Sequence, residues 1–362
     1  MFVRAITRKP APHIEGSTID YLTAQTTGGV NEVYPAEAVQ PAPHPFGARD
    51  GGGFSEPAYV FELRDIDFWG CYGGSIVTAD NHLLADLSPE VWGIENHPIF
   101  SSLHLPKARP LSGRTAIVVT PEAPANYYHW IVDLLPRVAL IREAAGNFEN
   151  FERILINGSR AHYEQSSLAA FGVPANELIY VDARHRFRIA SSTIPSMDHS
   201  SKIVAPWKLR ALRQMRDGLI DIDSGTPSRI YISRKNAVVR RVLNETNLAP
   251  ALREAGFTMI ELEPLLWSEQ VRLFSNAAVV LAPHGAALAN IAFCRPNTVV
   301  AEIGTRAGYR DFYLRLAASG SLRYDFIEAR PRTKPRPASR RAFEDEDMVL
   351  DEQTLKNFLR NL

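Results

Sequence analysis

The chain has 362 residues, of which 45% are hydrophobic and 22% charged, a composition typical of a globular protein with room for two hydrophobic cores. The 40 Lys and Arg side chains balance 40 Asp and Glu side chains, and the zero net charge excludes a general attraction to nucleic acid or to an anionic membrane. With only Cys71 and Cys294, the chain has neither a disulfide framework nor a cysteine-based zinc site.

Signals for export and for membrane insertion are also missing from the sequence. Mixed polar sequence follows Met1–Arg4, which argues against a signal peptide. No stretch approaches the roughly 18–20 apolar residues that a membrane span needs. We therefore expect a cytoplasmic protein without a transmembrane segment, with peripheral attachment to a membrane left open. Its oligomeric state is unknown from the sequence.

The first part of the chain, residues 1–112, is predicted to be an irregular lead-in followed by a β-rich extension. Residues 1–57 are rich in proline and glycine and include the run Asp50-Gly51-Gly52-Gly53, which is typical of loops. Short alternating segments follow at Tyr59–Leu63 and Ser75–Thr78. Alternation bounded by turn residues predicts antiparallel strands there.

Residues 113–222 show a different pattern, in which short apolar runs alternate with longer amphipathic stretches. The predicted strands are Ala116–Val119, Ile154–Ile156 and Leu178–Val181, and the predicted helices are Tyr127–Ala145, Tyr163–Phe171 and Pro206–Ile220. Strands that alternate with helices indicate parallel βαβ units. We therefore predict a Rossmann-like domain over residues 113–222.

The same alternation restarts after residue 222 and predicts a second Rossmann-like domain over residues 223–345. Its predicted strands are Ile230–Ile232, Thr258–Leu262, Val279–Ala282, Val299–Ile303 and Tyr324–Ile327. Its predicted helices are Glu245–Glu254, Glu269–Ser275, one from about Gly285, and Arg310–Ala318. The basic, proline-rich Arg330–Arg341 is interpreted as a solvated connector. Residues 346–362 are predicted to end in a helix that docks back on the body.

The first group of residues suited to chemistry is Asn126–Arg137, which follows a predicted strand and a short loop. Ligands of open α/β sheets bind beyond the carboxyl ends of the strands, so this junction is well placed. If Asn126 caps the helix, His129 and Asp133 are four residues apart on one helical face. A carboxylate beside an imidazole fixes its tautomer and raises its basicity, as a general base requires. The alternative is two polar residues that face a loop.

Aromatic residues are dense in the same segment. The close spacing of Asn126, Tyr127, Tyr128 and Trp130 at one strand end favours a functional site. The alternative, which the sequence leaves open, is that the tyrosines and the tryptophan pack the core.

The second group is Val279–Asn290, in which a buried strand turns through Pro-His-Gly into a run of small residues. Gly285 and Ala286 allow another group to approach the backbone closely, where the first amides of a helix are free. Such amides and the helix dipole suit a diphosphate, and His284 is placed to add a hydrogen bond. Tight packing between helix and sheet is the alternative explanation for the small residues.

The third group follows the strand Ile230–Ile232, where Arg234 and Lys235 are natural phosphate ligands. Their alternative is a solvated basic turn. Glu302, on the strand Val299–Ile303, is predicted to bind ribose hydroxyls, with a structural role as the alternative. The Asp-Ile-Asp triplets at 65–67 and 221–223 are interpreted as surface features, so no metal site is predicted.

Taken together, the three segments resemble glycosyltransferase family 61, and their order along the chain agrees with the family. The resemblance rests on Asn126–Arg137, on Ile230–Arg241, and on Leu281–Asn290 continuing to Glu302, and it covers roughly residues 113–330. It implies a GT-B architecture, in which two facing Rossmann-like domains carry the acceptor and the nucleotide. One difference is Ala287, which stands where many relatives have glycine.

The resemblance also implies an activity. The chain is expected to be an inverting, metal-independent glycosyltransferase that needs no cofactor and moves a sugar from a nucleotide-diphosphate donor, by family habit UDP, onto an oligosaccharide or lipid-linked glycan. Arg234, Lys235 and the amides after His284 would neutralise the departing diphosphate. His129 would deprotonate the acceptor hydroxyl, with Asp133 orienting it. The acceptor would be contacted by Asn126, Tyr127, Tyr128 and Trp130. A role in bacterial capsule or lipopolysaccharide synthesis is the expected setting.

Two other functions stay open at this point. A ketal pyruvyltransferase that modifies polysaccharide would use the same cations for phosphoenolpyruvate and would not need Glu302 for ribose. A non-catalytic glycan-binding subunit would use Tyr127, Tyr128 and Trp130 to bind sugar and would have no turnover.

Overall fold

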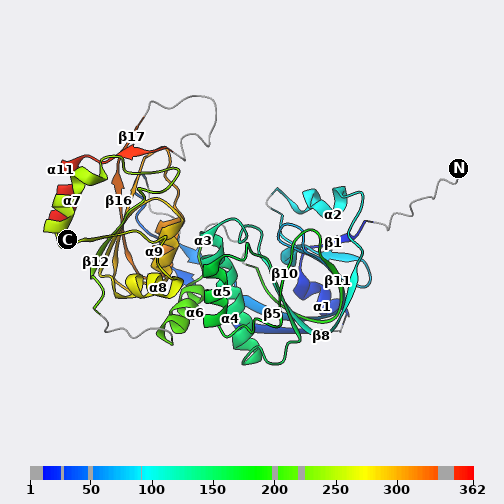
Figure 1. Cartoon of the computed structure of the whole chain (residues 1–362). Helices are drawn as coiled ribbons and strands as arrows, with labels where there is room; N and C mark the ends of the chain where they lie inside the picture. The colour runs from blue at the N-terminus through cyan, green and yellow to red at the C-terminus, as the bar shows by residue number, and fades with distance from the viewer. Residues whose placement is uncertain are drawn as a thin grey trace.

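The computed structural model of the chain describes residues 11–25, 28–47, 52–90, 92–197, 203–218, 225–332 and 346–362. Within these ranges two large sheets lie at opposite ends of the molecule, and helices pack between them (Figure 1). The predicted α/β class is confirmed. The triplet at 221–223 and most of the predicted connector at 330–341 lie outside the described residues.

The first sheet has nine strands in the order β1-β7-β6-β5-β11-β8-β9-β10, with β2 paired to β5 as well. Their bounds are β1 His13–Glu15, β2 Gly29–Tyr34, β5 Ala58–Trp69, β6 Ser75–Val77, β7 His82–Leu84, β8 Arg109–Val118, β9 Arg153–Ile156, β10 Leu178–Tyr180 and β11 Arg186–Pro195. Strands β8, β9 and β10 are parallel, as the alternation of strands and helices predicts.

The long strand β11 was not predicted, and it changes the character of this sheet. It runs antiparallel to β5 and parallel to β8, so it joins the β-rich part of the chain to the βαβ part. Strand β8 itself crosses the boundary expected at residues 112 and 113. The two parts therefore share one mixed sheet, and the β-rich residues are continuous with the following βαβ units.

The helices of the first half cover this sheet on the side of the second half (Figure 1). They are α3 Tyr127–His129, the π-helical turn η3 Trp130–Leu134, α4 Leu135–Ala145, α5 His162–Ala170 and α6 Pro206–Asp217. The first three are one continuous helix over the predicted range. Its π turn lies beside Pro136, which has no N–H and so cannot complete a regular α-helical ladder.

The second sheet is wholly parallel, with the order β13-β12-β14-β15-β16. Its strands are β12 Arg229–Ile232, β13 Thr258–Ile260, β14 Val279–Pro283, β15 Val299–Gly304 and β16 Arg323–Glu328. Its helices are α7 Glu245–Glu254, α8 Trp267–Asn276, η4 Ala286–Phe293 and α9 Phe312–Ser319. The chain leaves β12 toward β13 on one side and returns to β14 on the other. The point between β12 and β14 is therefore the topological switch point, where open α/β sheets bind ligands.

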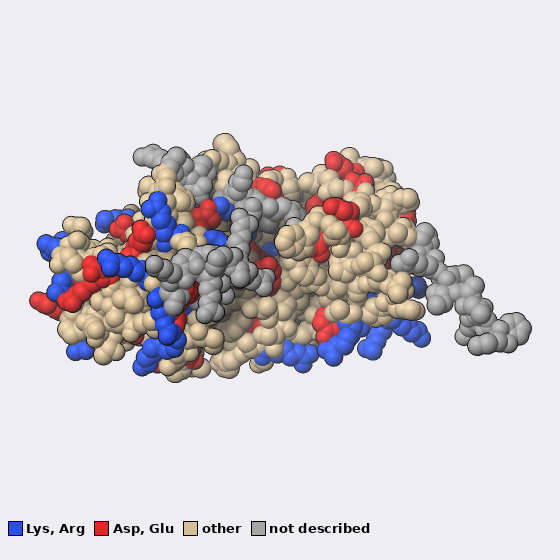
Figure 2. Space-filling view, turned by 90° about the horizontal axis from the view of Figure 1, so that it is seen from above, with Lys and Arg blue, Asp and Glu red and all other residues tan. Residues whose placement is uncertain are grey.

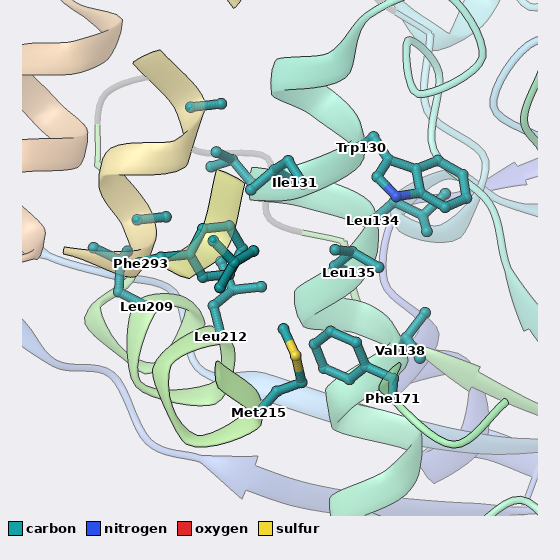
Figure 3. Close-up of a cluster of buried hydrophobic side chains, with 14 of the residues drawn as sticks. Trp130, Ile131, Leu134, Leu135, Val138, Phe171, Leu209, Leu212, Met215 and Phe293 are labelled. Carbon is teal, nitrogen blue, oxygen red and sulfur yellow. The ribbon is translucent and has the colours of Figure 1, made fainter. Parts of the chain in front are cut away.

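One hydrophobic core runs through the helices between the two sheets. It includes Leu135 of α4, Leu212 of α6 and Phe293 of η4, each at most 1% exposed. Figure 3 shows these side chains meeting from the three helices. Because the core is continuous, burial of apolar area stabilises the arrangement of the two sheets as well as each sheet alone.

The N-terminal residues differ from the predicted irregular lead-in, since they form α1 Thr18–Gln25 and the short strands β1, β2, β3 Ala38–Val39 and β4 Gly53–Phe54. Tyr34 stacks on Trp207 of α6 with ring centroids 5.2 Å apart. Further on, Phe46 packs edge-on against Tyr309 at 5.4 Å and Phe326 at 5.3 Å. Residues 28–47 therefore contact both halves of the molecule.

The C-terminal residues return to the second sheet. Strand β18 Met348–Val349 pairs with β17 Arg330–Pro331, and α11 Glu352–Arg360 follows. Asp351 caps this helix by accepting a hydrogen bond from the Thr354 amide at 3.0 Å. Leu355 is fully buried in the core of the second sheet. The other helices of the described residues are the single turns η1 Ala85–Leu87, η2 Ile94–Asn96 and α2 Pro98–Ser101.

The zero net charge conceals an uneven distribution of charge over the surface. In the half that holds the first sheet, Lys and Arg side chains gather along one edge of the view in Figure 2, while acidic side chains lie toward the other. The neighbouring strands β5, β11 and β8 carry the exposed residues Arg64, Arg188 and Arg109. The surface is thus locally basic in a chain without a net charge.

Candidate active site

At the switch point of the second sheet, the structure brings Arg234 and Gly285 together. Arg234 follows β12 and Gly285 follows β14, the two strands that flank the switch point. A Cβ atom on Gly285 would lie 2.2 Å from Nη1 of Arg234, so the guanidinium rests against the glycine backbone. Glycine is needed here for this close approach and not for a special φ angle, because its φ of 167° is extended.

The Arg234 guanidinium is largely buried without a carboxylate against it. Its Nη2 donates to the Val239 carbonyl at 3.1 Å, whereas its buried Nε has no hydrogen-bond partner. None of the ion pairs among the described residues includes Arg234. Burial lowers the pKa of Arg234, and the nearby charge of Arg240 lowers it further. A buried cation next to a second cation is suited to an anionic ligand with bidentate geometry.

The backbone after β14 adds donors to the same place. The helix expected from about Gly285 is present as the 3₁₀-helix Ala286–Phe293. Its first hydrogen bond runs from the Leu288 amide to the Gly285 carbonyl at 2.9 Å, so the amides of Ala286 and Ala287 precede the helical ladder. The Gly285 carbonyl also accepts a hydrogen bond from the Tyr313 hydroxyl at 2.6 Å, which fixes the turn.

His284 is held by a carboxylate beneath it. Its Nδ1 lies 2.5 Å from Oε1 of Glu302, and Oε2 of Glu302 accepts a hydrogen bond from the Tyr324 hydroxyl at 2.6 Å. The Glu302 side chain is fully buried. The predicted ribose contact of Glu302 is therefore wrong, because both its oxygens are engaged inside the protein. Glu302 orients His284 instead.

Lys235 does not join this cluster. Its ammonium pairs with Glu261 at 2.5 Å, and its side chain is 58% exposed. Successive residues after a strand point in different directions, so Arg234 turns inward while Lys235 turns to solvent. In the part of the chain that the structure describes, no contact links Lys235 to Gly285.

The first half contributes a second cluster around His129. The Asn126 side chain caps α3 as predicted, because it accepts a hydrogen bond from the Tyr128 amide at 2.9 Å. His129 Nδ1 then lies 2.6 Å from Asp133 Oδ2, and its Nε2 lies 2.7 Å from Glu122 Oε2. Lys208 of α6 approaches the other oxygen of Asp133 at 3.5 Å. The imidazole is thus bracketed by two carboxylates.

These contacts shift the ionisation of the pair. Burial by itself lowers the pKa of His129, but the hydrogen bond and charge of Asp133, with the charge of Glu122, raise it above the ordinary histidine value. Burial raises the pKa of Asp133, yet His129 and Lys208 together lower it overall. Asp133 stays ionised and supports a protonated or strongly basic imidazole.

The predicted aromatic residues separate into different roles. Trp130 is fully buried and donates through Nε1 to Ser167 at 2.9 Å, so its predicted contact with the acceptor is wrong. The Tyr127 hydroxyl donates to Asn290 of η4 at 2.6 Å and thereby links the two halves. Tyr128 packs against His129, with ring centroids 5.3 Å apart.

A pocket of about 500 Å³ opens beside His129, and its walls come from both halves of the molecule. It is lined by Glu56, Pro57, Ala58, Pro89, Thr120, Pro121, Glu122, Tyr128, His129, Asp133, Arg137, Ser196, Met197, Ile203, Val204, Trp207, Lys208, Phe312 and Arg315. Buried Arg137 links the ends of β8 and β11 at this pocket, because it donates hydrogen bonds to the carbonyls of Val119, Pro195 and Ser196.

Sequence reasoning missed Glu122, Lys208 and Arg315 at this pocket. Glu122 lies in the loop just before the helix of His129, and that position was a usable signal. Lys208 and Arg315 come from helices far away in the sequence, and no local pattern places them beside Asp133 or Tyr128.

Aromatic rings connect the two clusters. Tyr128 packs on Tyr313 with centroids 5.9 Å apart, and Tyr313 packs on His284 at 5.2 Å. Tyr313 also bonds the Gly285 carbonyl. Tyr128 and Tyr313 therefore connect the His129 pocket to the Arg234–Gly285 site.

Other candidate features carry no site. Among the described residues, no three His, Cys, Asp or Glu side chains gather closely enough to hold a metal ion. Asp67 of the first Asp-Ile-Asp triplet pairs with Arg186 at 2.7 Å. Cys71 and Cys294 are buried and free, as expected. The described part of the chain holds no helix of sufficient length and apolarity to cross a membrane.

Residues 127–301 match the model of the family described as Glycosyltransferase 61. The matched region contains His129, Arg234 and His284, and so spans both clusters. A comparison with curated proteins finds no match. The match supports the predicted resemblance to this family over that part of the chain.

Proposed function

We propose that the chain is an inverting, metal-independent glycosyltransferase of GT-B architecture that moves a sugar from a nucleoside diphosphate, UDP being the favoured nucleotide, to a glycan hydroxyl. The observation that carries this proposal is the contact of Arg234 with Gly285 at the switch point of the second sheet. A largely buried guanidinium, helix-start amides and an oriented histidine form an anion site there.

In the proposed reaction the acceptor oxygen attacks the anomeric carbon of the donor as the bond from that carbon to the diphosphate oxygen breaks. The proton of the acceptor hydroxyl passes to Nε2 of His129, and the electron pair of the broken bond stays on the diphosphate. Arg234 and the amides of Ala286 and Ala287 stabilise that charge. Because Glu122 contacts Nε2 in this structure, the acceptor hydroxyl replaces its carboxylate on binding.

The biological setting follows from the sequence resemblance alone. We propose a cytoplasmic enzyme, peripheral to a membrane where its acceptor is lipid-linked, that acts in the synthesis of a bacterial surface polysaccharide such as capsule or lipopolysaccharide.

The experiment is a thermal-shift titration with UDP, GDP and CMP in the presence of EDTA. We expect UDP to raise the Tm of the wild-type protein and Arg234→Ala to abolish that shift. The matched control is Arg323→Ala, since Arg323 is an exposed arginine at the amino edge of the same sheet. A shift that survives Arg234→Ala, or no shift with any nucleotide, contradicts the proposal. Nucleotide sugars can then be screened for hydrolysis.

A further inference from the structure

The pocket beside His129 has two kinds of wall, and the difference bears on the acceptor. Its polar groups include His129, which contacts Glu122 through one ring nitrogen and Asp133 through the other. Lys208 approaches Asp133 as well. Most of the remaining lining is apolar: Pro57, Ala58, Pro89, Pro121, Met197, Ile203, Val204, Trp207 and Phe312.

The other polar lining residues are mostly committed to partners within the protein. Arg137 is occupied by three backbone carbonyls, Arg315 pairs with Asp311, and the Ser196 hydroxyl accepts the Tyr59 amide at 3.0 Å. A bare sugar that filled the pocket would bury several hydroxyls against apolar groups. Each hydroxyl left without a partner would weaken binding severalfold or more.

Two side chains of the pocket lining bear on the chemistry of the group that it would bind. The Thr120 hydroxyl is buried without a hydrogen-bond partner, and Thr120 is only 4% exposed. Phe312 is a large apolar side chain that is 43% exposed although it lines a pocket and packs against Tyr128 at 5.7 Å. The Thr120 hydroxyl needs a polar partner, and the Phe312 ring needs an apolar partner.

From these observations we propose that the acceptor is amphipathic: a sugar hydroxyl binds between His129 and Thr120, and an apolar aglycone attached to that sugar covers Phe312 and Met197. The apolar group is an alkyl chain or an aromatic ring. This inference rests on the proposed function, because it assigns the pocket to the acceptor.

The positions of the pocket-lining residues in the sequence support a role of the apolar lining in acceptor specificity. The family match begins at residue 127 and ends at residue 301. His129 and Asp133 lie inside it, whereas Pro57, Pro121 and Phe312 come from segments outside it. The proposed base and its carboxylate thus lie inside the region that matches the family. Part of the surface that would select the acceptor comes from segments on either side of that region.

The test is a binding titration, by calorimetry, of methyl, phenyl and octyl β-D-glucopyranoside, the last below its micelle concentration, without any donor. We expect the octyl or phenyl compound to bind at least about tenfold more tightly than the methyl compound, because its apolar surface leaves water. The octyl arm represents a lipid-borne acceptor and the phenyl arm an aromatic one. Phe312→Ser should remove most of the preference, and Phe312→Leu should retain it.

Leu103→Ser is the matched control, because Leu103 is 75% exposed and lies outside the pocket. Equal binding of the three compounds, or a preference that survives Phe312→Ser, would overturn the inference. Failure of the proposed function is a separate result: UDP would then give no thermal shift, whatever the glycosides do. A UDP shift together with equal glycoside binding removes only the amphipathic acceptor.

Discussion

The two clusters around the tyrosine pair are built in different ways. The Arg234–Gly285 site depends on strand order, because its members follow two neighbouring parallel strands and meet only at the switch point. The His129 cluster depends on one helix, with Asp133 a turn away, and on side chains that α6 and the preceding loop bring to it. In the proposed mechanism the first arrangement binds the diphosphate, and the second holds the base beside an open pocket.

The largest expected effect is a loss of turnover without a loss of nucleotide binding, which distinguishes the His129 cluster from the Arg234–Gly285 site. His129→Ala removes the proposed base, so we expect kcat to fall about 10²–10⁴-fold. The thermal shift caused by UDP should stay as in the wild type, because no contact joins His129 to Arg234 among the described residues. Turnover and nucleotide binding are measured on the same preparation. An unchanged kcat would remove His129 from the mechanism.

A smaller effect is expected at the turn after β14. Gly285→Ala places a methyl group against the Arg234 guanidinium, which must move, although the extended backbone accepts alanine. We expect UDP affinity to fall on the order of tenfold, in keeping with the loss of one charge-assisted hydrogen bond. Titration calorimetry measures this change. Gly16→Ala, at a glycine with open space around its Cβ position and no left-handed φ, controls for the substitution itself.

The pH dependence of activity tests the pair formed by His129 and Asp133. A base works only when deprotonated, so kcat/KM should rise with pH and level off above the pKa of His129, which lies above the ordinary histidine value. Asp133→Asn removes the charge that raises this pKa, and the inflection should move to lower pH while the plateau falls about tenfold. An inflection that does not move would assign the titration to another group.

The smallest effect concerns the link between the halves. Tyr127→Phe deletes the hydroxyl that donates to Asn290, which is fully buried. We expect the free energy of unfolding to fall by about 1 kcal/mol. Tyr72→Phe, at a tyrosine that is 39% exposed, should change it much less. Equal effects of the two variants in urea unfolding would show that the Asn290 contact does not stabilise the fold.

Much of the fold could be predicted because local patterns determine it. The helix over residues 127–145, helix α7 and the five strands of the second sheet lie where apolar periodicity and turn residues put them. Arg234 and Gly285 meet because a wholly parallel sheet aligns the carboxyl ends of its strands.

What could not be predicted depends on distant parts of the chain. Strand β11 pairs with β5 over more than 100 residues of sequence separation, and no local signal specifies that partner. The sequence shows that Glu302 lies on a strand, and this position suggested a ribose ligand. The sequence does not show that the carboxylate is buried and bonded to Tyr324. Trp130 was misassigned for the same reason, since only the packing of α5 shows that it faces the core.

The most direct measurement is a crystal structure of the protein soaked with UDP. We expect the diphosphate to lie between the Arg234 guanidinium and the amides of Ala286 and Ala287, at the carboxyl ends of β12 and β14. A diphosphate bound elsewhere, for example in the pocket beside His129, would contradict it.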